Sequence, residues 1–381
     1  EDFIIDGMEM LNYLTFCSPS ISDRLWALFP AACAAWHRQG YHIDNVNSVV
    51  DNYVRRGNER FLQDPANIEA VYGMAAKAIS ESGQSVGSVR GAALLSILLL
   101  NCRGRMDGYV PLIVNDIIFR FWDSADSRQL RIALLRISSH LLLYDAKLTL
   151  QALTLRPDAS MFFQNICTEF DFGADEIRRA SGLHYPLHEK RAIALGLAAV
   201  MELPYATMPP WLQAMVPKLL STATRLIADI RQERDEDHRG DIDYEAQWHS
   251  EGSGFGGSDD DVYGSASSQE LDVLESLKDD EDWEMLGDGS AKLRSVRGSR
   301  HKREQQNQEQ SESDSNPDLN EITAPLQDVD EFRSFATVLQ GFAARPDSQG
   351  LLENARSGMD ASARHTLDSL LDQSAQVRND G

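Results

Sequence analysis

Basic residues and cysteines are scarce in this sequence of 381 residues. Lys and Arg number 36 against 59 Asp and Glu, which gives a formal net charge of −23 and a pI near 4.7. Because contact with phosphates requires basic surface, this balance argues against a nucleic-acid partner and favours a polycation such as a basic protein. The four cysteines, Cys17, Cys33, Cys102 and Cys167, form no CxxC pair. Their apolar helical contexts predict buried thiols in a reducing compartment.

Long apolar runs and catalytic motifs are also missing. The longest apolar run, 92–100, is broken by Ser96 and is far shorter than the ~20 residues that span a bilayer. No signal peptide and no GxSxG, Walker-type or GxGxxG motif in a strand–turn–helix context occurs. His184 and His188 are four residues apart, but Pro186 would break a helix that aligned them as metal ligands. We therefore expect a soluble intracellular protein that enters no membrane, needs no metal or cofactor and is not an enzyme.

Apolar residues recur with the 3.6-residue helical period from residue 2 to about residue 232. The clearest segments are 22–38, 43–54, 109–122, 130–144 and 212–230. Residues 148–155 could form a strand, but with no second strand nearby to pair with, we predict a helix. Residues 1–232 are therefore predicted to be all-α.

A recurring apolar-Pro dipeptide indicates helical repeats. Phe29-Pro30, Val110-Pro111 and Val216-Pro217 each lie near the start of a predicted helix, where Pro is tolerated. Pro30 and Pro111 are 81 residues apart, about twice the ~40 residues of a HEAT unit. The next interval, 106 residues, is not a clean multiple. We predict HEAT-like repeats over 1–232, with an irregular helical domain as the alternative.

An acidic segment follows the helical part. Residues 233–288 hold 20 acids and three bases, so they carry −17 of the total charge of −23. Rich in Gly and Ser and without periodicity, residues 233–325 are predicted to be an acidic low-complexity disordered segment, because they cannot bury enough apolar surface to offset ordering entropy. Helical periodicity returns at 332–342 and 363–371, so residues 326–381 are predicted to form C-terminal capping helices.

The acidic segment contains the candidate binding residues. They are two groups of acids, the second enclosing an aromatic ring: Asp259, Asp260, Asp261, Asp279, Asp280, Glu281, Asp282, Trp283 and Glu284. An aromatic ring among acids can supply apolar contact while the carboxylates neutralise Lys and Arg of a partner. We expect a flexible polyanion that captures basic cargo in a salt-sensitive way; an inert solvated linker is the alternative.

Five collinear stretches resemble the importin-β (karyopherin-β) superfamily of nuclear transport receptors, and within it the C-terminal part of the importin seven/eight branch. They are LWALFPAACAAWHRQGYHIDNVNSVVDNYV, NCRGRMDGYVPLIV, HEKRAIALGLAAVMELP, LDVLESLKDDEDWE and DVDEFRSFATVLQGFAARPD. The matching positions include Cys102, Gly104, Arg105, Asp107, Pro111, Leu112, His188, Lys190, Leu195, Gly196 and Leu197. The acidic segment is thinner here than in the family, and a basic patch at 290–303 has no counterpart in it.

The resemblance implies a HEAT-repeat α-solenoid with a long disordered acidic insertion and a C-terminal helical cap. It implies a nuclear import receptor that carries basic protein cargo, of the histone and ribosomal protein class, through the nuclear pore in a Ran-GTP-regulated cycle. FG nucleoporins are implied partners, and the implied location is the cytoplasm, the nucleus and the nuclear envelope. In that family Ran-GTP docks mainly on N-terminal repeats, which this chain lacks. The start at Glu1 leads us to expect that the natural protein extends upstream.

Three points stay open at this stage. The function could instead be that of a non-transport HEAT-repeat scaffold, a histone-chaperone-like protein with an acidic tract, or an enzyme with a divergent site. The basic patch 290–303 could be a localisation signal or an intramolecular competitor for cargo. Gly254-Phe255-Gly256 mimics the FG dipeptide of nucleoporins, although chance in a Gly-rich tract explains it as well.

Overall fold

The computed structural model of the chain describes residues 2–18, 20–39, 46–81, 86–122, 128–170, 185–251, 283–285, 291–293, 326, 329–346 and 348–379. They belong to two units. One unit, the helical body, comprises residues 1–237 with 317–381, and the other comprises 238–316. Each unit is described by itself below.

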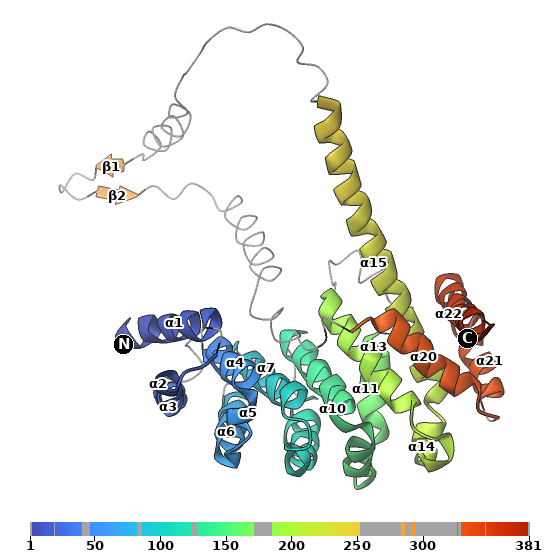
Figure 1. The fold of residues 1–381 in the computed structure, drawn as a ribbon, viewed down its shortest axis with the longest axis horizontal. Coiled ribbons are helices and arrows are strands. Elements are labelled where there is room, and N and C mark those ends of the chain that lie inside the picture. Colours follow the sequence, from blue (N-terminus) through green and yellow to red (C-terminus); the bar gives the residue numbers. More distant parts are fainter. Residues whose placement is uncertain are drawn as a thin grey trace, which may run out of the picture. The chain divides into compact units, whose positions relative to one another are not determined.

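The helical body contains the helices drawn in Figure 1, except that the last part of α15, from residue 238, belongs to the second unit. In chain order they are α1 (Asp2–Cys17), α2 (Asp23–Trp26), α3 (Phe29–Gln39), α4 (Val46–Arg56), α5 (Asn58–Phe61), α6 (Pro65–Glu81), α7 (Val86–Asn101), η2 (Asp107–Tyr109), α8 (Val110–Leu112), the π-helix η3 (Ile113–Phe119), α9 (Arg120–Trp122), α10 (Arg128–Thr154), α11 (Ser160–Glu169), α13 (Leu187–Met201), η5 (Tyr205–Thr207), α14 (Pro210–Gln213), α15 (Val216–Glu251), α20 (Glu331–Ala343), α21 (Gln349–Ser357) and α22 (Ala361–Asn379).

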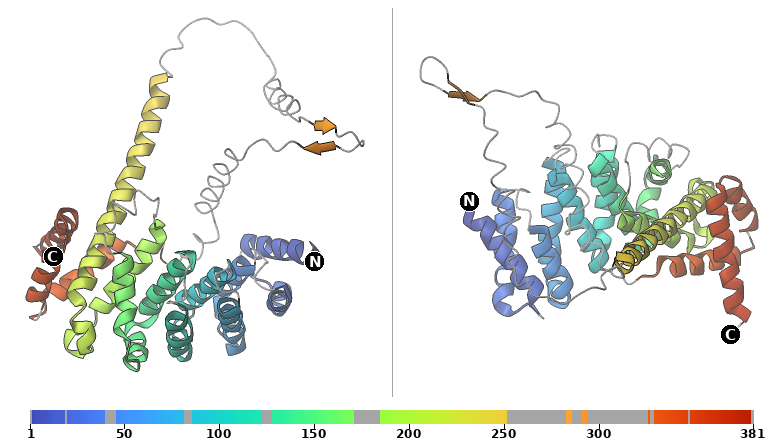
Figure 2. Two further views of the ribbon diagram at one scale, coloured as in Figure 1. Left: turned by 180° about the vertical axis from the view of Figure 1, so that it is seen from behind. Right: turned by 90° about the horizontal axis from the view of Figure 1, so that it is seen from above.

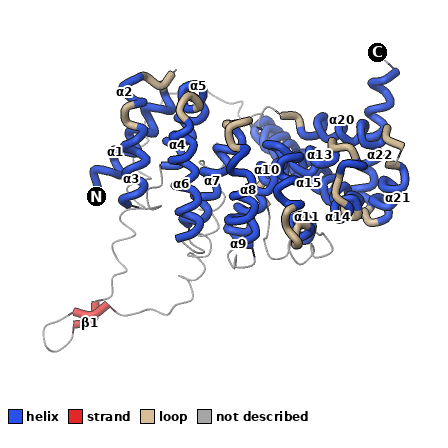
Figure 3. The backbone as a smooth tube through the Cα atoms, turned by 90° about the horizontal axis from the view of Figure 1, so that it is seen from below, coloured by secondary structure: helices blue, strands red, loops and turns tan. Residues whose placement is uncertain are grey.

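One row of helices runs through the body in chain order. Within it, α1 packs on α4, α4 on α7, α7 on α10, α10 on α13, α13 on α20 and α20 on α22. Other helices pair with members of this row: α3 with α4, α6 with α7, and η3 with α10. Figure 2 and the tube in Figure 3 show the same stacking from other sides. Helix pairs that contact their neighbours in sequence order form an α-solenoid, so the predicted all-α fold is confirmed.

The core of the body is continuous from one helix pair to the next. Helix α7 is buried on nearly all sides, since every residue from Ala92 to Leu99 is buried. Its Gly91 marks a close approach to α6: a Cβ at this position would lie 2.7 Å from the carbonyl oxygen of Ala75. The apolar run at 92–100 is therefore the interior of a helical stack. No helix of the described residues is long and apolar enough to cross a membrane.

The three proline dipeptides each open a helix, as predicted. Phe29, Val110 and Val216 are the first residues of α3, α8 and α15. The second interval is longer partly because α10 has 27 residues and bends at Asp145, whose backbone is extended (φ −161°, ψ 100°). The Asp145 carboxylate accepts a hydrogen bond from the Leu148 N–H at 2.8 Å and so caps the second part of α10. This confirms a helix at 148–154.

Helix α15 continues to Glu251, beyond the predicted boundary at 232. Residues 233–251 are therefore helical, whereas we expected them to be disordered. They have no apolar stripe, but adding residues to a helix that the core has already nucleated costs little. The loss of the apolar stripe therefore does not mark the end of a helix that extends beyond the core.

Two short strands form a hairpin in the second unit. β1 (Trp283–Met285) pairs antiparallel with β2 (Ala291–Leu293), although both lie in the segment predicted to be disordered. The connecting sequence holds Gly287, Asp288 and Gly289, which are residues that favour turns.

The cysteines require a further correction. All four were predicted to be buried, and Cys33, Cys102 and Cys167 are buried, but Cys17 is exposed.

The C-terminal helices continue the solenoid. Helix α20 packs on α13 in the main row, and α22 packs on α20. Phe335, Leu339 and Phe342 of α20 are buried. Because α15 precedes the acidic segment and α20 follows it, this segment is an insertion into the solenoid. We refer to residues 252–325, which contain the candidate acids, as the acidic insertion.

Candidate functional site

The predicted binding residues fall mostly outside the described part of the chain. This holds for Asp259, Asp260, Asp261, Asp279, Asp280, Glu281 and Asp282, and for Gly254-Phe255-Gly256. Trp283 and Glu284 lie in β1. In the hairpin Trp283 stands opposite Leu293, and Glu284 stands opposite Lys292. The backbone therefore brings the last of the candidate acids into register with the first base of the patch at 290–303.

Around the start of α13, buried charges join four helices. Three consecutive residues of α13 each face a different neighbour: Glu189 faces α10, Lys190 faces α15 and Arg191 faces α20. Successive residues of an α-helix point about 100° apart, so one turn can reach three sides. We call this cluster the charged junction. It comprises Arg136, Glu189, Lys190, Arg191, Asp229, Glu233, Arg234 and Glu331.

The first part of the junction is a buried ion pair between α10 and α13. Arg136 Nε donates to Glu189 Oε1 at 2.5 Å, and the two side chains are 3% and 1% exposed. Burial alone would raise the pKa of the Glu189 carboxyl, but Arg136 and the nearby His188 outweigh it and hold that pKa at about 2. Glu189 is therefore charged at every physiological pH, and the pair is permanent.

His140 of α10 lies close to this pair and is completely buried. Burial, followed by repulsion from Arg136, lowers the pKa of His140 to about 3. Neither ring nitrogen of His140 has a hydrogen-bond partner among the described residues. The imidazole is therefore a neutral core group near neutral pH. His188, the other histidine near the pair, has Nε2 3.4 Å from Glu189 Oε1.

In the second part of the junction, Lys190 is held by two acids of α15. Its Nζ donates to Asp229 Oδ2 at 2.5 Å and also to Glu233. The Lys190 side chain is 4% exposed, so two carboxylates compensate one buried cation. These contacts fix α15 to α13 just before the chain enters the acidic segment.

The third part of the junction joins both sides of the insertion. Glu331, the first residue of α20, is buried and forms ion pairs with two arginines: its carboxylate oxygens lie 3.2 Å from Arg191 Nε and 2.7 Å from Arg234 Nη2. Arg191 Nη2 also donates to the carbonyl oxygens of Leu326 and Val329, at 2.8 and 2.9 Å. Arg234 precedes the insertion, and Leu326 follows it. The junction therefore holds α15 and the start of α20 to α13.

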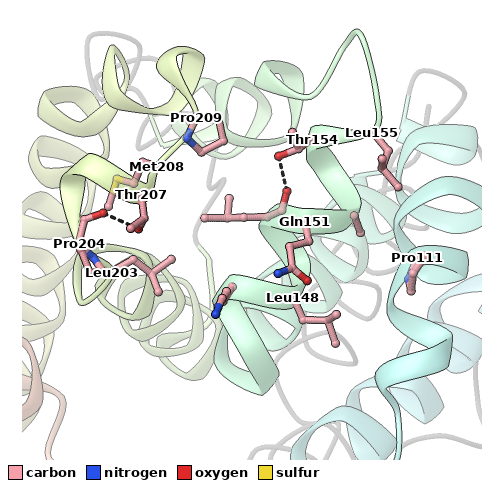
Figure 4. Close-up of a pocket in the computed structure, with 13 residues that line it drawn as sticks. Pro111, Leu148, Gln151, Thr154, Leu155, Leu203, Pro204, Thr207, Met208 and Pro209 are labelled. Carbon is pink, nitrogen blue, oxygen red and sulfur yellow. Dashed lines mark hydrogen bonds between the residues drawn. The ribbon is translucent and has the colours of Figure 1, made fainter.

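A separate apolar groove of about 710 Å³ lies on the helical body (Figure 4). Its walls come from α8, from the second part of α10 and from the segment between α13 and α14; the lining residues are Pro111, Lys147, Leu148, Leu150, Gln151, Ala152, Thr154, Leu155, Leu203, Pro204, Thr207, Met208 and Pro209. Leu155 is 84% exposed. With an exposed leucine and three prolines in its lining, the groove is a candidate surface for a small apolar group.

No candidate metal centre accompanies these features in the described residues. Nowhere among them do three His, Cys, Asp or Glu side chains come together in a way that could hold a metal ion. His184, the partner considered for His188, lies outside the described residues.

Three curated proteins are similar to this chain. Importin-8 of Danio rerio is 24% identical over 222 residues, which cover 55% of the chain and 20% of that protein. An importin beta-like SAD2 homolog of Arabidopsis thaliana is 25% identical over 224 residues, with the same coverage. A probable importin-7 homolog of Dictyostelium discoideum is 25% identical over 162 residues, 40% of the chain and 15% of that protein. The chain is related to the importin-β family.

The matched region of this chain spans about a fifth of the length of the first two of these proteins. No protein-family model and no solved structure matches the chain. The relationship therefore rests on sequence similarity to the three importins and agrees with the helical solenoid of the body.

The sequence pattern did not predict the charged junction. The signal was present in the stretch HEKR, residues 188–191, and in Asp330-Glu331 at the start of α20. Alternating acids and bases at a helix start usually lie in solvent, and the sequence does not show that α10, α15 and α20 surround this turn. The apolar groove was missed because its walls come from three separate segments.

Proposed function

We propose that the chain is part of a nuclear import receptor that binds basic protein cargo and carries it through the nuclear pore. The observation that carries this proposal is a polyanionic segment inserted into a helical solenoid that is related to importins. A solenoid offers extended binding surface, and the insertion adds a strong negative charge to it. The protein would then move between cytoplasm and nucleus.

The charge of the insertion supports basic proteins, such as histones and ribosomal proteins, as cargo. Residues 252–288 contain twelve acids and one base, and Trp283 lies beside Asp282 and Glu284. Carboxylates attract Lys and Arg over a Debye length of roughly 8 Å at physiological salt, which raises the association rate. An aromatic ring adds apolar contact once the partner is near.

The apolar groove supports FG nucleoporins as a second class of partner. Phenylalanine side chains are small apolar groups, and the groove offers Leu155, Met208 and prolines around an opening (Figure 4). Polar groups at its edge, such as Gln151 and Thr207, can bond to the peptide backbone that flanks such a phenylalanine. Regulation by Ran-GTP belongs to the same proposal and would act mainly through further repeats.

The cargo proposal is tested by neutralising the insertion while leaving the junction intact. Deletion from residue 233 would remove Glu233 and Arg234, which hold α15 and α20. The better variant replaces the twelve acids of 252–288 by Asn and Gln and keeps the chain length. Binding to purified core histones is measured by fluorescence anisotropy from 50 to 500 mM NaCl.

We expect this variant to bind histones at least ~10-fold more weakly at low salt and with a flatter salt dependence. A control variant replaces three exposed acids of the body, Asp6, Glu9 and Glu59, and we expect it to retain wild-type binding. Equal affinity and equal salt dependence for the neutralised variant and the wild type would exclude the insertion as the cargo site.

The transport proposal is separated from a histone-chaperone-like scaffold by binding to FG repeats, which such a scaffold does not require. Leu155→Asp places a charge in the groove at a position that is 84% exposed, so the core is unaffected. We expect capture on immobilised FG-repeat peptide to fall by about tenfold, as for a central interface residue. Leu28→Asp, at a 44% exposed position outside the groove, is the control. Absence of FG binding by the wild type would favour the scaffold.

A further inference from the structure

Helix α20 is held on the rest of the helical body by three kinds of non-covalent contact. The first is apolar: Phe335, Leu339 and Phe342 are buried, each within 1% of complete burial. They lie four and three residues apart, so they form one face of the helix, which packs on α13. This face alone gives α20 the character of a docked amphipathic helix.

The second contact is the buried charge at the start of α20. Asp330 caps the helix by accepting from the Arg333 N–H at 3.0 Å, and Glu331 is enclosed by Arg191 and Arg234. The Arg234 guanidinium also lies 5.4 Å from the centre of the Phe332 ring. Arg191 of α13 and Arg234 of α15 thus pair with the acidic first turn of α20.

The third contact is at the other end of α20. Arg345 donates to the carbonyl oxygens of Leu203 and Glu202, at 2.6 and 2.8 Å. These carbonyls follow the last turn of α13 and carry the negative end of its dipole, so a cation there is favourable. Helix α20 is therefore matched to α13 at both ends as well as along its apolar face.

We propose that the α13–α15 surface is a docking site for an amphipathic helix with an acidic first turn and a basic end, and that α20–α22 occupy it as a separable module. Covalent connection through the acidic insertion is then not required to keep them in place. Each unit of a solenoid contacts chiefly its neighbours, so a terminal module can dock as one cooperative piece. This proposal does not depend on transport activity.

The test cuts the acidic insertion in the intact, folded chain. A recognition sequence for a site-specific protease replaces residues 304–310, and the cut protein is passed through a sizing column at about 1 µM and 100 mM NaCl. We expect the two fragments to elute together. Separation of the wild-type fragments under these conditions would overturn the proposal.

Substitutions then identify the contacts that carry the docking. Glu331→Gln removes the buried carboxylate that pairs with Arg191 and Arg234, and we expect the dissociation constant of the cut fragments to rise at least ~100-fold. Glu353→Gln, the same change at an exposed position of α21, leaves it unchanged. Equal dissociation constants for these two variants would show that the charge at Glu331 does not carry the docking.

A second variant keeps the test decisive if Glu331→Gln disturbs folding of the uncut chain, as judged from its circular dichroism. Arg345→Gln removes the contact at the far end of α20 and leaves the buried charges intact. We expect the dissociation constant of the cut fragments to rise about tenfold, since two charge-assisted hydrogen bonds are lost. No change for Arg345→Gln would remove the end-matching part of the proposal.

Discussion

The helical body and the acidic segment use charged residues in opposite ways. In the body, Arg136 pairs with Glu189, Lys190 with two acids, and Glu331 with two arginines, and each of these pairs has at least one buried member. Residues 233–288 instead carry 20 acids against three bases. Paired charges in the interior specify which helices meet, whereas an excess of one sign attracts a partner of the other sign.

The boundary between these two uses lies inside α15. Asp229, Glu233 and Arg234 on this helix belong to the charged junction. Acids farther along the same helix, from Asp235 onward, add to the excess of negative charge. The role of an acid on this helix therefore depends on whether it lies within the charged junction or beyond it, and not on its residue type. Three predictions test this difference, from the largest effect to the smallest.

The largest effect is expected where a paired charge in the body loses its partner. Glu189→Gln leaves the Arg136 guanidinium buried beside a neutral group and is expected to lower the free energy of unfolding by about 3–5 kcal/mol, measured by urea denaturation. The double variant Arg136→Met with Glu189→Leu should recover most of this loss, because no unpaired charge remains. Asp23→Asn, in an exposed pair with Arg60, should change little. A loss after Glu189→Gln no larger than that of the control would refute the assigned role of the buried pair.

The second effect concerns the neutral histidine beside that pair. The pKa of His140 is about 3 in the folded chain, against about 6.5 when unfolded, so its contribution to stability is present above pH 6.5 and is lost as the pH falls toward 3. One proton taken up on unfolding lowers the free energy of unfolding by ~2 kcal/mol between pH 7.5 and pH 5. His140→Leu should remove this part of the pH dependence. Parallel curves for the two proteins over this range would show that His140 does not bind a proton on unfolding.

The smallest effect is expected in the basic patch that follows the acids. Lys292 stands opposite Glu284 in the hairpin, so bases of the patch can compete with the proposed basic cargo for the same acids. Replacing Lys292, Arg294 and Arg297 by Gln should tighten binding of core histones about two- to fivefold, the scale of exposed ion pairs. The control removes three exposed bases of the body, Arg24, Lys218 and Arg364, and so makes the same change in net charge. Equal gains from both variants would indicate net charge and no local competition.

Local patterns predicted the helices well. The apolar period of 3.6 residues located the helices at 22–38, 109–122 and 130–144, and the proline dipeptides marked three helix starts. These features are local, because one face of a helix must be apolar wherever it packs. The end of α15 was predicted wrongly for the same reason, since the apolar face stops at Ile230 but the backbone helix continues to Glu251.

The sequence by itself determined that this chain is a helical solenoid interrupted by an acidic segment, and five stretches in it pointed to the importin-β family. Only the tertiary structure decided which charges pair. Glu189 and Arg136 are 53 residues apart, and Lys190 and Asp229 are 39 apart. Periodicity encodes which side of a helix is apolar, whereas the partner of a buried charge depends on which helices surround it. That is why Glu189, Lys190 and Arg191, adjacent in the sequence, bind three different helices.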